Sequence, residues 1–563
     1  MTTVTESTPA RASGTEINAC AGTDTLTVYW NKPDEATADV VYEVQVHDIE
    51  GDDVPSRIHH LPHTHCTIDG LEPEHSYDIT VSMLTETSGT KANHTPLGRR
   101  TFTTGSGKHT IDVTDAPYNA VGDGRTLNTA AIQRALDDCG PDDAVLVPDG
   151  VFLTGALRMH ANTELVVANG AVLQGTANPL DYLPMLPSRF EGIELDCYAS
   201  LITVGHLDHN AEATCRNVVI RGGGTIAGGG RALAEAVIER ERGRVEAELA
   251  ATGQSLDDYE KPETIPGRVH PRLITIANAS HVELADVTFA NGASWTVHMI
   301  YSDHIVTHGC AFRSHGVWNG DGWDPDSSED CTIFDCDFDT GDDIIAIKSG
   351  KNPEGNVIAR PTRHIRIFNC RASEGGHALA IGSEMSGGVE DVDVWDCDLS
   401  GLWYGVEVKT TLKRGGWVRG LRVRDAVMRR AVIRAVPYND DGIGADTPPV
   451  LEGFRFERVR LLGGLPDDVD AGAPQEAIHI QGLPAPAKPI RNVVFHDVTF
   501  GGRDGSCNGD EHDEKNPCGA DDESGATDIV ANRCEGLEIR GIRCAARGKT
   551  GKTGKTFLER SGE

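Results

Sequence analysis

The sequence predicts an all-β chain in which a small β-sandwich precedes a right-handed parallel β-helix. The first observation is that residues 15–105 alternate apolar and polar positions in short segments separated by turn residues, which is typical of a sandwich. The second is that paired short β-segments recur from about residue 145 onwards, mostly 23 to 39 residues apart. One such unit cannot bury its apolar face alone, whereas stacked units can, and this favours a solenoid.

The charge balance of the chain excludes some classes of partner. The chain has 563 residues, and its 51 basic and 86 acidic residues give a formal net charge of −35. Nucleic acids and anionic membrane surfaces both require a basic face, so neither is expected as a partner. No apolar stretch approaches the ~20 residues of a membrane span, and the N-terminus lacks the basic and apolar segments of a secretory signal. We therefore expect a cytoplasmic protein that acts on short imported molecules.

The N-terminal part of the chain is predicted to consist of a flexible segment and the sandwich. Residues 1–14 are rich in Ser and Thr, and residues 15–105 carry the alternating pattern. Within the sandwich, a turn at residues 70–73 precedes Tyr77, and this arrangement resembles a fibronectin type III domain. The resemblance implies an accessory or spacer module.

Residues 106–545 are predicted to form the β-helix, and residues 546–563 a tail. Near its start, Asn128 is expected to cap a helix whose apolar positions form one stripe. These positions are Ala131, Ile132, Ala135 and Leu136. Such a helix can close the end of a solenoid, whose edge would otherwise remain open.

Cysteines recur at similar places in four of the repeats. The repeats begin near residues 217, 281, 304, 331, 364, 391, 420, 453, 492 and 536. The four cysteines are Cys310, Cys336, Cys370 and Cys397. We expect them to form an interior stack of free thiols rather than disulfides. No two C-x-x-C elements occur, so the sequence gives no zinc signal.

Two segments interrupt the repeats. Residues 231–253 are predicted to form a charged, solvated helix beside the solenoid. Residues 504–525 are acidic and rich in turn residues, so a mobile loop is expected there, with a divalent-cation site as the alternative. The "GKTGKT" at residues 551–556 lacks the earlier glycine of a nucleotide-binding loop and is assigned to the tail.

An acidic segment inside the repeats is the first candidate for chemistry. Residues 319–352 contain ten acidic residues among recurring apolar ones, and Asp321 lies 21 residues before Asp342 and Asp343. One coil of a β-helix takes a little over 20 residues, so the three carboxylates should stack on neighbouring coils ~4.8 Å apart. Like charges this close raise at least one carboxyl pKa, and paired carboxylates are the groups that hydrolyse glycosides. The other aspartates here fit turns and caps: Asp324, Asp326, Asp335, Asp337 and Asp339.

Two further polar residues are expected on the following coils. His377 lies between glycines in "EGGHALAIGSE", and Lys409 lies in "YGVEVKTTLKRGG". A groove lined by three aspartates, a histidine and a lysine on successive coils is difficult to explain by packing alone. A single histidine or lysine would more often be an ordinary surface residue.

Four segments, in this order, resemble glycoside hydrolase family 28, the polygalacturonases. They are Asn319-Gly320-Asp321, the pair Asp342-Asp343 in "TGDDIIAIKSG", Gly376-His377-Ala378 and Glu407-Val408-Lys409. Together with "YNAVGDG" from residue 118, the resemblance covers about residues 110–545. The segment "IGSEMSGGV" and the N-terminal sandwich resemble the exo-acting bacterial members in particular.

The resemblance implies a role for each of these residues. Asp342 would be the general acid, while Asp321 and Asp343 would activate the water that inverts the anomeric carbon. His377 would support the protonation of the acid and the placement of the substrate, and Lys409 would pair with a substrate carboxylate. Neither a metal nor a cofactor is expected.

Glu407 stands where the family has an arginine. An anion beside Lys409 would repel a uronate carboxylate, unless Glu407 neutralises Lys409 or binds a sugar hydroxyl. We therefore count Glu407 among the substrate-binding residues and expect the leaving sugar to differ from the usual one.

The sequence thus predicts an exo-acting hydrolase that releases galacturonic acid from the non-reducing ends of short pectic oligosaccharides. The first alternative is a hydrolase of rhamnogalacturonan or another uronate-poor glycoside, which Glu407 favours. A calcium-dependent pectate lyase on the same fold would need a calcium cage and an arginine base. A non-catalytic carbohydrate-binding β-helix is the third alternative.

Overall fold

The computed structural model describes residues 15–49, 56–87, 90–258, 268–402, 404–435, 442–463, 476–501 and 529–544. The N-terminal segment 1–14, the acidic insertion 504–525 and the tail 546–563 lie outside the described residues. The chain divides into two compact units, Met1–His109 and Thr110–Glu563. Among the described residues, no helix is long and apolar enough to cross a membrane.

The first unit is the predicted antiparallel β-sandwich. One sheet has the strand order β1-β2-β5, and the other has the order β4-β3-β6-β7. Trp30 and Tyr42 meet edge to face in the core with ring centroids 5.5 Å apart, and both are buried. The hydroxyl of Tyr77 accepts the backbone N–H of Glu72 at 2.9 Å, so this tyrosine fixes the turn that precedes its strand.

The strands of the sandwich are β1 (Ile17–Ala21), β2 (Leu26–Trp30), β3 (Val41–Asp48), β4 (Arg57–Leu61), β5 (His65–Ile68), β6 (Ser76–Thr87) and β7 (Thr90–Thr103).

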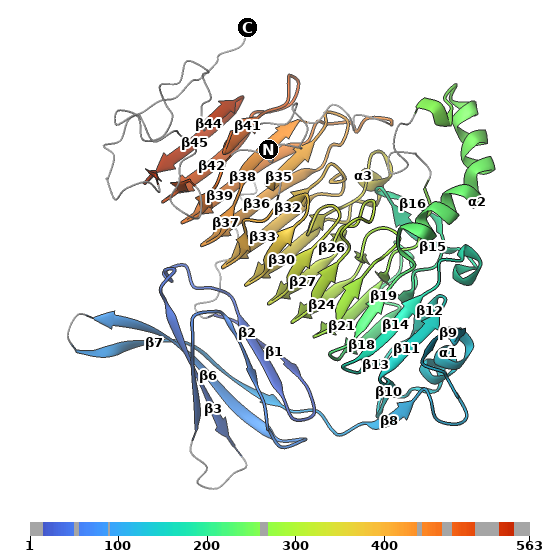
Figure 1. The fold of residues 1–563 in the computed structure, drawn as a ribbon. Helices are drawn as coiled ribbons and strands as arrows, with labels where there is room; N and C mark the ends of the chain where they lie inside the picture. Colours follow the sequence, from blue (N-terminus) through green and yellow to red (C-terminus); the bar gives the residue numbers. More distant parts are fainter. Residues whose placement is uncertain are drawn as a thin grey trace, which may run out of the picture. The chain divides into compact units, whose positions relative to one another are not determined.

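The second unit is the predicted right-handed parallel β-helix, in which most coils contribute one strand to each of three long sheets (Figure 1). The first and second sheets have 13 strands each. The third sheet has runs of 5 and 6 strands, joined by the bridges Trp323–Ile345 and Asp326–Lys348. Apolar side chains of all three sheets fill the interior of the coils as one core.

The first sheet comprises β8 (His109–Asp112), β10 (Asp143–Val147), β13 (Glu164–Val167), β18 (Cys215–Arg221), β21 (Ala279–Ala285), β24 (Asp303–His308), β27 (Glu329–Phe334), β30 (Thr362–Phe368), β33 (Val389–Trp395), β36 (Trp417–Arg424), β39 (Val450–Glu457), β42 (Ile490–His496) and β45 (Cys534–Arg540). The second comprises β9 (Asp123–Leu127), β11 (Gly150–Thr154), β14 (Ala171–Gly175), β19 (Thr225–Ala227), β22 (Thr288–Ala290), β25 (Ala311–Arg313), β28 (Asp337–Asp339), β31 (Arg371–Glu374), β34 (Asp398–Leu399), β37 (Val427–Met428), β40 (Arg460–Leu461), β43 (Thr499–Phe500) and β46 (Arg543–Cys544). The third comprises β12 (Leu157–Met159), β17 (Ile202–Gly205), β20 (Ile274–Ala277), β23 (Val297–Ile300), β26 (Trp323–Asp326), β29 (Ala346–Ile347), β32 (His377–Ile381), β35 (Gly405–Thr410), β38 (Arg430–Ala435), β41 (Ile478–Gln481) and β44 (Ile529–Asn532).

The remaining elements are the antiparallel hairpin of β15 (Leu186–Phe190) and β16 (Ile193–Cys197), the helices α1 (Thr129–Asp138), α2 (Gly230–Ala251) and α3 (Glu354–Ile358), and the 3₁₀ turns η1 (Pro179–Tyr182) and η2 (Leu256–Asp258).

Helix α1 packs its predicted apolar side on the core at the first coils, but its cap differs from the prediction. Asn128 occupies the N-cap position and makes no side-chain bond to the helix. Its side chain instead bonds both the N–H and the C=O of Val121 and the C=O of Thr126. Asn128 therefore holds the preceding loop rather than the helix end, because the loop offers it more partners than the helix does.

Five neighbouring strands of the first sheet contain a residue with a left-handed backbone near their start. His281, His304, Asp330, His364 and Asp391 follow one another in register across the first sheet, and each has a φ between 52° and 59°. Aspartate, asparagine and histidine tolerate this conformation better than most residues, and glycine tolerates it best. Asp335, with a φ of 52°, lies in the bend after β27, as predicted.

The predicted cysteine stack is confirmed. Cys310, Cys336, Cys370 and Cys397 are buried, unoxidised and level with one another on successive coils. Each thiol donates to the carbonyl two residues earlier at 3.2–3.4 Å. The side chains are small enough to sit at the turn, and the weak S–H donor is satisfied locally.

Helix α2 covers residues 230–251, close to the predicted 231–253. It is not solvated all round. Leu233, Val237, Val245 and Leu249 are buried, while the opposite side carries arginine–glutamate pairs such as Arg244–Glu248 at 2.8 Å. The helix is therefore anchored to the solenoid by one apolar side.

The stack of aromatic rings along the first sheet should carry much of the stability of the solenoid. The rings of Phe334, Phe368 and Trp395 are buried and lie parallel, with centroids 4.9 and 4.5 Å apart. We expect Phe368→Ala to lower the free energy of unfolding by about 3–5 kcal/mol, because it leaves a cavity between two rings. Denaturant unfolding would measure this. The exposed Arg371→Ala on the adjoining strand should cost less than about 1 kcal/mol, and an equal loss for both would contradict the prediction.

Candidate active site

The structure brings Asp321, Asp342 and Asp343 together on adjacent coils. Asp321 precedes β26 and Asp343 precedes β29, and the N–H of Gly322 donates to the carbonyl of Asp343 at 2.9 Å. This bond puts Asp321 level with Asp343. Asp321 and Asp343 are buried, whereas Asp342 is partly exposed at the turn. The spacing argument from the sequence therefore places the carboxylates as predicted.

His377 lies on the next coil and is held between two carboxylates. Its Nδ1 is 2.5 Å from Oδ1 of Asp343, and its Nε2 contacts Oε2 of Glu407. The backbone N–H of His377 also donates to Asp343, at 3.1 Å. The charge of His377 lowers the pKa of Asp342, so His377 does not favour the protonated acid as the resemblance implied. Its direct partner is Asp343.

Lys409 approaches the same carboxylate from one coil further along. Its Nζ is 3.9 Å from Oδ2 of Asp343, and its side chain is 15% exposed. The amine therefore lies at the edge of the cluster, where a substrate group could reach it.

Glu407 does not present its charge to the surface. Its side chain is 2% exposed, and its two oxygens contact Nε2 of His377 and Nε of Arg434. The charges of His377, Lys409 and Arg434 outweigh burial and lower the pKa of Glu407, so the expected interaction with Lys409 is present, whereas a direct bond from this buried carboxylate to a sugar differs from the arrangement. Because two cations already compensate the carboxylate, it neither faces the substrate nor opposes an anionic sugar.

The carboxylates of the cluster differ in their tendency to bind a proton. The pKa of Asp342 is raised by burial and by the neighbouring charge of Asp343. Burial also raises the pKa of Asp321, with Asp324 as the next contributor, although Lys348 opposes the shift. For Asp343 the charges of His377 and Lys409 outweigh burial and hold its pKa well below the usual range. The cluster thus combines carboxyl groups whose pKa values are shifted in opposite directions.

Asn319 and Arg268 support Asp342, and sequence reasoning missed Arg268. Nδ2 of Asn319 donates to Oδ2 of Asp342 at 3.4 Å, and Nη1 of Arg268 donates to Oδ1 of Asn319 at 2.5 Å. Arg268 also pairs with Glu191. Arg268 precedes β20 without any recognisable motif, so only the fold reveals its place.

Lys348 is a second residue that the sequence interpretation missed. Its Nζ is 3.3 Å from Oδ2 of Asp321 and 4.3 Å from the centroid of the Trp295 ring. Its side chain is buried, and Asp324 and Asp321 raise its pKa despite burial. The sequence held a signal, because Lys348 interrupts the apolar alternation of "DDIIAIK" at an outward position.

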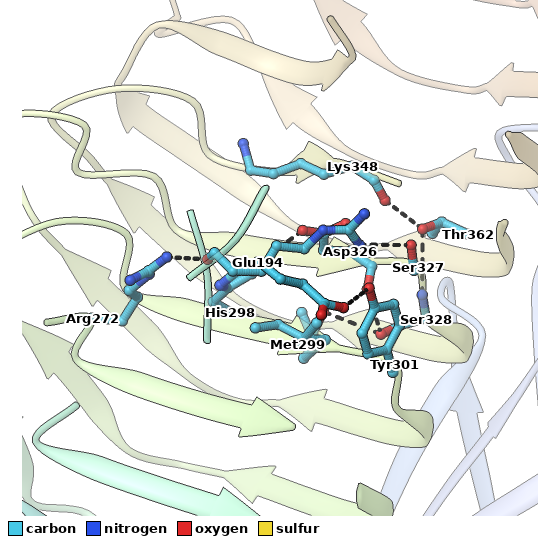
Figure 2. Close-up of polar contacts among 12 residues, drawn as sticks. Glu194, Arg272, His298, Met299, Tyr301, Asp326, Ser327, Ser328, Lys348 and Thr362 are labelled. Atoms are coloured by element: carbon cyan, nitrogen blue, oxygen red, sulfur yellow. Dashed lines mark hydrogen bonds and ion pairs between the residues drawn. The ribbon is translucent and has the colours of Figure 1, made fainter. Parts of the chain in front are cut away.

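The assignment of Asp324 and Asp326 to turns or caps was wrong. Both lie on β26 and are fully buried. Asp326 accepts Nη1 of Arg189 at 2.9 Å and lies 3.3 Å from Nε2 of His298 (Figure 2). The W-D-P-D alternation does point these aspartates outward, but the β15–β16 hairpin then covers them.

The hairpin is tied to the third sheet at several points. Oε1 of Glu194 accepts the hydroxyl of Tyr301 at 2.6 Å, as Figure 2 shows. The ring of Phe190 stacks on Trp295 with centroids 4.9 Å apart. The hairpin therefore covers the third sheet on the coil that carries Asp321 and on the coil before it.

A cavity of about 580 Å³ lies beside this cluster rather than in it. It is bounded mainly by α2, Arg268, His270 and Trp318, and none of the six predicted site residues lines it. Its lining offers no group of carboxylates at catalytic spacing. We therefore place the chemistry at Asp321, Asp342 and Asp343 rather than in this cavity.

Comparisons with known proteins show which proteins this chain resembles. Residues 211–436 match the family model "Glycosyl hydrolases family 28", and residues 13–97 match "Fibronectin type III domain". The chain is 28% identical over 421 residues to an exo-poly-alpha-D-galacturonosidase of Dickeya chrysanthemi, which covers 71% of this chain and 68% of that protein. It is 27% identical over 413 residues to a probable polygalacturonase of Vitis vinifera, covering 70% and 74%. Among solved structures, a family 28 exopolygalacturonase of Yersinia enterocolitica superimposes with a TM-score of 0.74 at 22% identity, over 96% of both chains.

The buried pair of Arg189 and Asp326 should hold the hairpin in place. We expect Asp326→Asn to lower the free energy of unfolding by about 3–5 kcal/mol, because it leaves Arg189 charged and buried without its counter-ion. Thermal and denaturant unfolding would measure the loss. Asp337→Asn, the same change at an exposed ion pair with Arg371, is the control and should cost less than about 1 kcal/mol. Equal stability of the two variants would contradict the structural role of the pair.

Proposed function

We propose that the chain is an exo-polygalacturonase of glycosyl hydrolases family 28 that carries an N-terminal fibronectin type III domain. It releases galacturonic acid from the non-reducing ends of short pectic oligosaccharides by an inverting hydrolysis. The observation that carries this proposal is the presence of two kinds of carboxyl group in one cluster. Burial and the charge of Asp343 raise the pKa of Asp342, whereas the charges of His377 and Lys409 outweigh burial and lower the pKa of Asp343.

These opposite pKa shifts fit the two steps that glycoside hydrolysis requires. Asp342 is partly exposed and donates its proton to the glycosidic oxygen as the bond from that oxygen to the anomeric carbon breaks. Asp343, with Asp321 beside it, takes a proton from the water that forms the new bond to that carbon. Attack from the face opposite the leaving group inverts the anomeric configuration.

Local cations support an anionic sugar as the substrate. Lys409 and Arg434 are level with each other on adjacent strands, and both side chains reach the surface in part, at 15% and 21% exposure. The net charge of −35 would otherwise oppose an oligogalacturonate. Since His377 and Arg434 compensate Glu407, the argument for a uronate-poor substrate such as rhamnogalacturonan loses its basis.

The hairpin of β15 and β16 supports action at chain ends. It is fixed to the coil of Asp321 by the Arg189–Asp326 pair, and to the following coil by the bond from the N–H of Lys351 to the carbonyl of Gly192 at 3.0 Å. We infer that the hairpin blocks the extension of a polymer on this side of the carboxylates. A chain end avoids the collision, so the enzyme removes one terminal sugar at a time.

Product analysis on defined oligosaccharides tests the proposal. With trigalacturonate and a chelator present, we expect saturated monomeric galacturonate, released with the inverted anomeric configuration when followed by NMR. A rhamnogalacturonan oligomer should be cleaved far more slowly. Cleavage of the rhamnogalacturonan oligomer alone would show that the substrate is not a homogalacturonan and would overturn the proposed substrate. An unsaturated product that disappears with chelator would indicate a lyase and would overturn the proposal.

Asp342→Asn tests the general acid. We expect kcat to fall by about 10²–10⁴-fold, because the amide cannot donate a proton to the leaving oxygen. The melting temperature should stay close to that of the wild type, since the side chain keeps its size and its contact with Asn319. Asp337→Asn, at an exposed position, should leave kcat unchanged. Unchanged turnover of Asp342→Asn on trigalacturonate would remove Asp342 from the acid role.

A further inference from the structure

The protonation state of His377 follows from its hydrogen-bond partners. Nδ1 faces Oδ1 of Asp343, and Nε2 faces Oε2 of Glu407. An ionised carboxylate only accepts hydrogen bonds, so both ring nitrogens must carry hydrogen. A neutral imidazole would leave one of these contacts without a donor. The geometry therefore requires an imidazolium between two carboxylates.

Glu407 in turn is held in one orientation. Its other oxygen, Oε1, accepts Nε of Arg434 at 2.5 Å, and its side chain is 2% exposed. Glu407 therefore has no freedom to turn towards the substrate. Its hydrogen bond to Nε2 of His377 is its direct link to the catalytic carboxylates, and its charge also acts on Lys409.

We propose that Glu407 is a positioning residue for the hydrolysis: anchored by Arg434, it fixes His377 as an imidazolium that orients Asp343 towards the attacking water. This inference rests on the proposed function, in which Asp343 is the base. The arginine that the family carries at this position could not accept a bond from Nε2. The change to glutamate therefore changes what His377 can do in this chain.

Other groups around His377 also affect its pKa. Lys409 lies near the same carboxylate, and Tyr404 stacks on the imidazole with centroids 4.6 Å apart. Arg430 lies over the far side of the Tyr404 ring, at 5.3 Å. Burial and Lys409 favour the neutral imidazole, whereas Asp343 and Glu407 outweigh them and raise the pKa of His377 to about 9.

The sign of the pH effect follows directly. His377 is fully protonated well below pH 9, and it loses its proton as the pH rises through its pKa. Removing the charge of Glu407 removes one of the two anions that favour the imidazolium. The pKa of His377 then falls, and the alkaline limb of the pH–rate profile moves to lower pH by about one unit or more.

The experiment compares Glu407→Gln with Glu407→Asp and a charge-matched control. Glu476→Gln is the control, because Glu476 lies near the third sheet and pairs with His479 rather than His377. For Glu407→Gln on trigalacturonate we expect kcat to fall by up to about 100-fold, KM to change little, and the alkaline limb to shift as stated. Glu407→Asp keeps the charge and should keep the limb in place even if kcat falls. Glu476→Gln should resemble the wild type in both respects.

A titration without substrate separates this inference from the proposed function. In protein labelled with ¹³C at histidine Cε1, the signal missing from His377→Asn identifies His377. We expect its midpoint above pH 8 in the wild type and at lower pH in Glu407→Gln. The two proposals can fail separately. If the midpoint of His377 is lower in Glu407→Gln than in the wild type, but the wild type does not hydrolyse galacturonan, the proposed function is rejected and the effect of Glu407 on His377 stands. A midpoint that is equal in the wild type and Glu407→Gln, or equal alkaline limbs in Glu407→Gln and Glu407→Asp, would overturn the inference.

Discussion

The parallel backbone register between coils is the constraint on which the site depends. The bond from Gly322 N–H to the Asp343 carbonyl fixes the coil of Asp321 against the next one. The pairing of Ala346 with Ala380 continues the register to the coil of His377. Residues separated by 22 and 34 positions thus become neighbours along one edge. A shift by one residue would turn the outward carboxylates into the core, so the apolar interior and the site enforce the same register.

That register concentrates negative charge, and the structure compensates it unevenly. The charges of His377 and Lys409 both lower the pKa of Asp343. Lys348 interacts with both Asp324 and Asp321. Asp342 is held mainly by a neutral amide, that of Asn319. Uneven compensation raises the pKa of one carboxyl group while it lowers the pKa of its neighbour. A cation beside each carboxylate would have lowered the pKa of Asp342 as well, and no group in the cluster would then have a raised pKa suited to a general acid.

Spacing and motifs predicted the parts of the site that lie on consecutive coils. Repeat length alone brought Asp321 to Asp343, and the thiol stack followed from the recurrence of cysteine in the repeats. The failures involve contacts that local patterns do not encode. Arg189 reaches Asp326 from 137 residues earlier, so the burial of Asp326 could not be inferred from its own strand. His377 was expected to support the acid Asp342, whereas its hydrogen-bond partner is the adjacent Asp343, and sequence spacing alone does not distinguish two neighbouring aspartates.

Glu407 illustrates why a single altered motif residue is a weak guide to substrate charge. Considered alone, the exchange of an arginine for a glutamate suggests a subsite that repels uronates. In the fold, Val432 is the residue level with Glu407, and Arg434 lies two positions further along the same strand, level with Lys409. The guanidinium reaches back to Glu407, so the pair adds no net charge, and Lys409 remains at the surface edge of the cluster. In this chain the cation is Arg434 on the next coil, and the carboxylate of Glu407 contacts His377 in the interior of the site. Through His377, Glu407 affects the proposed base Asp343.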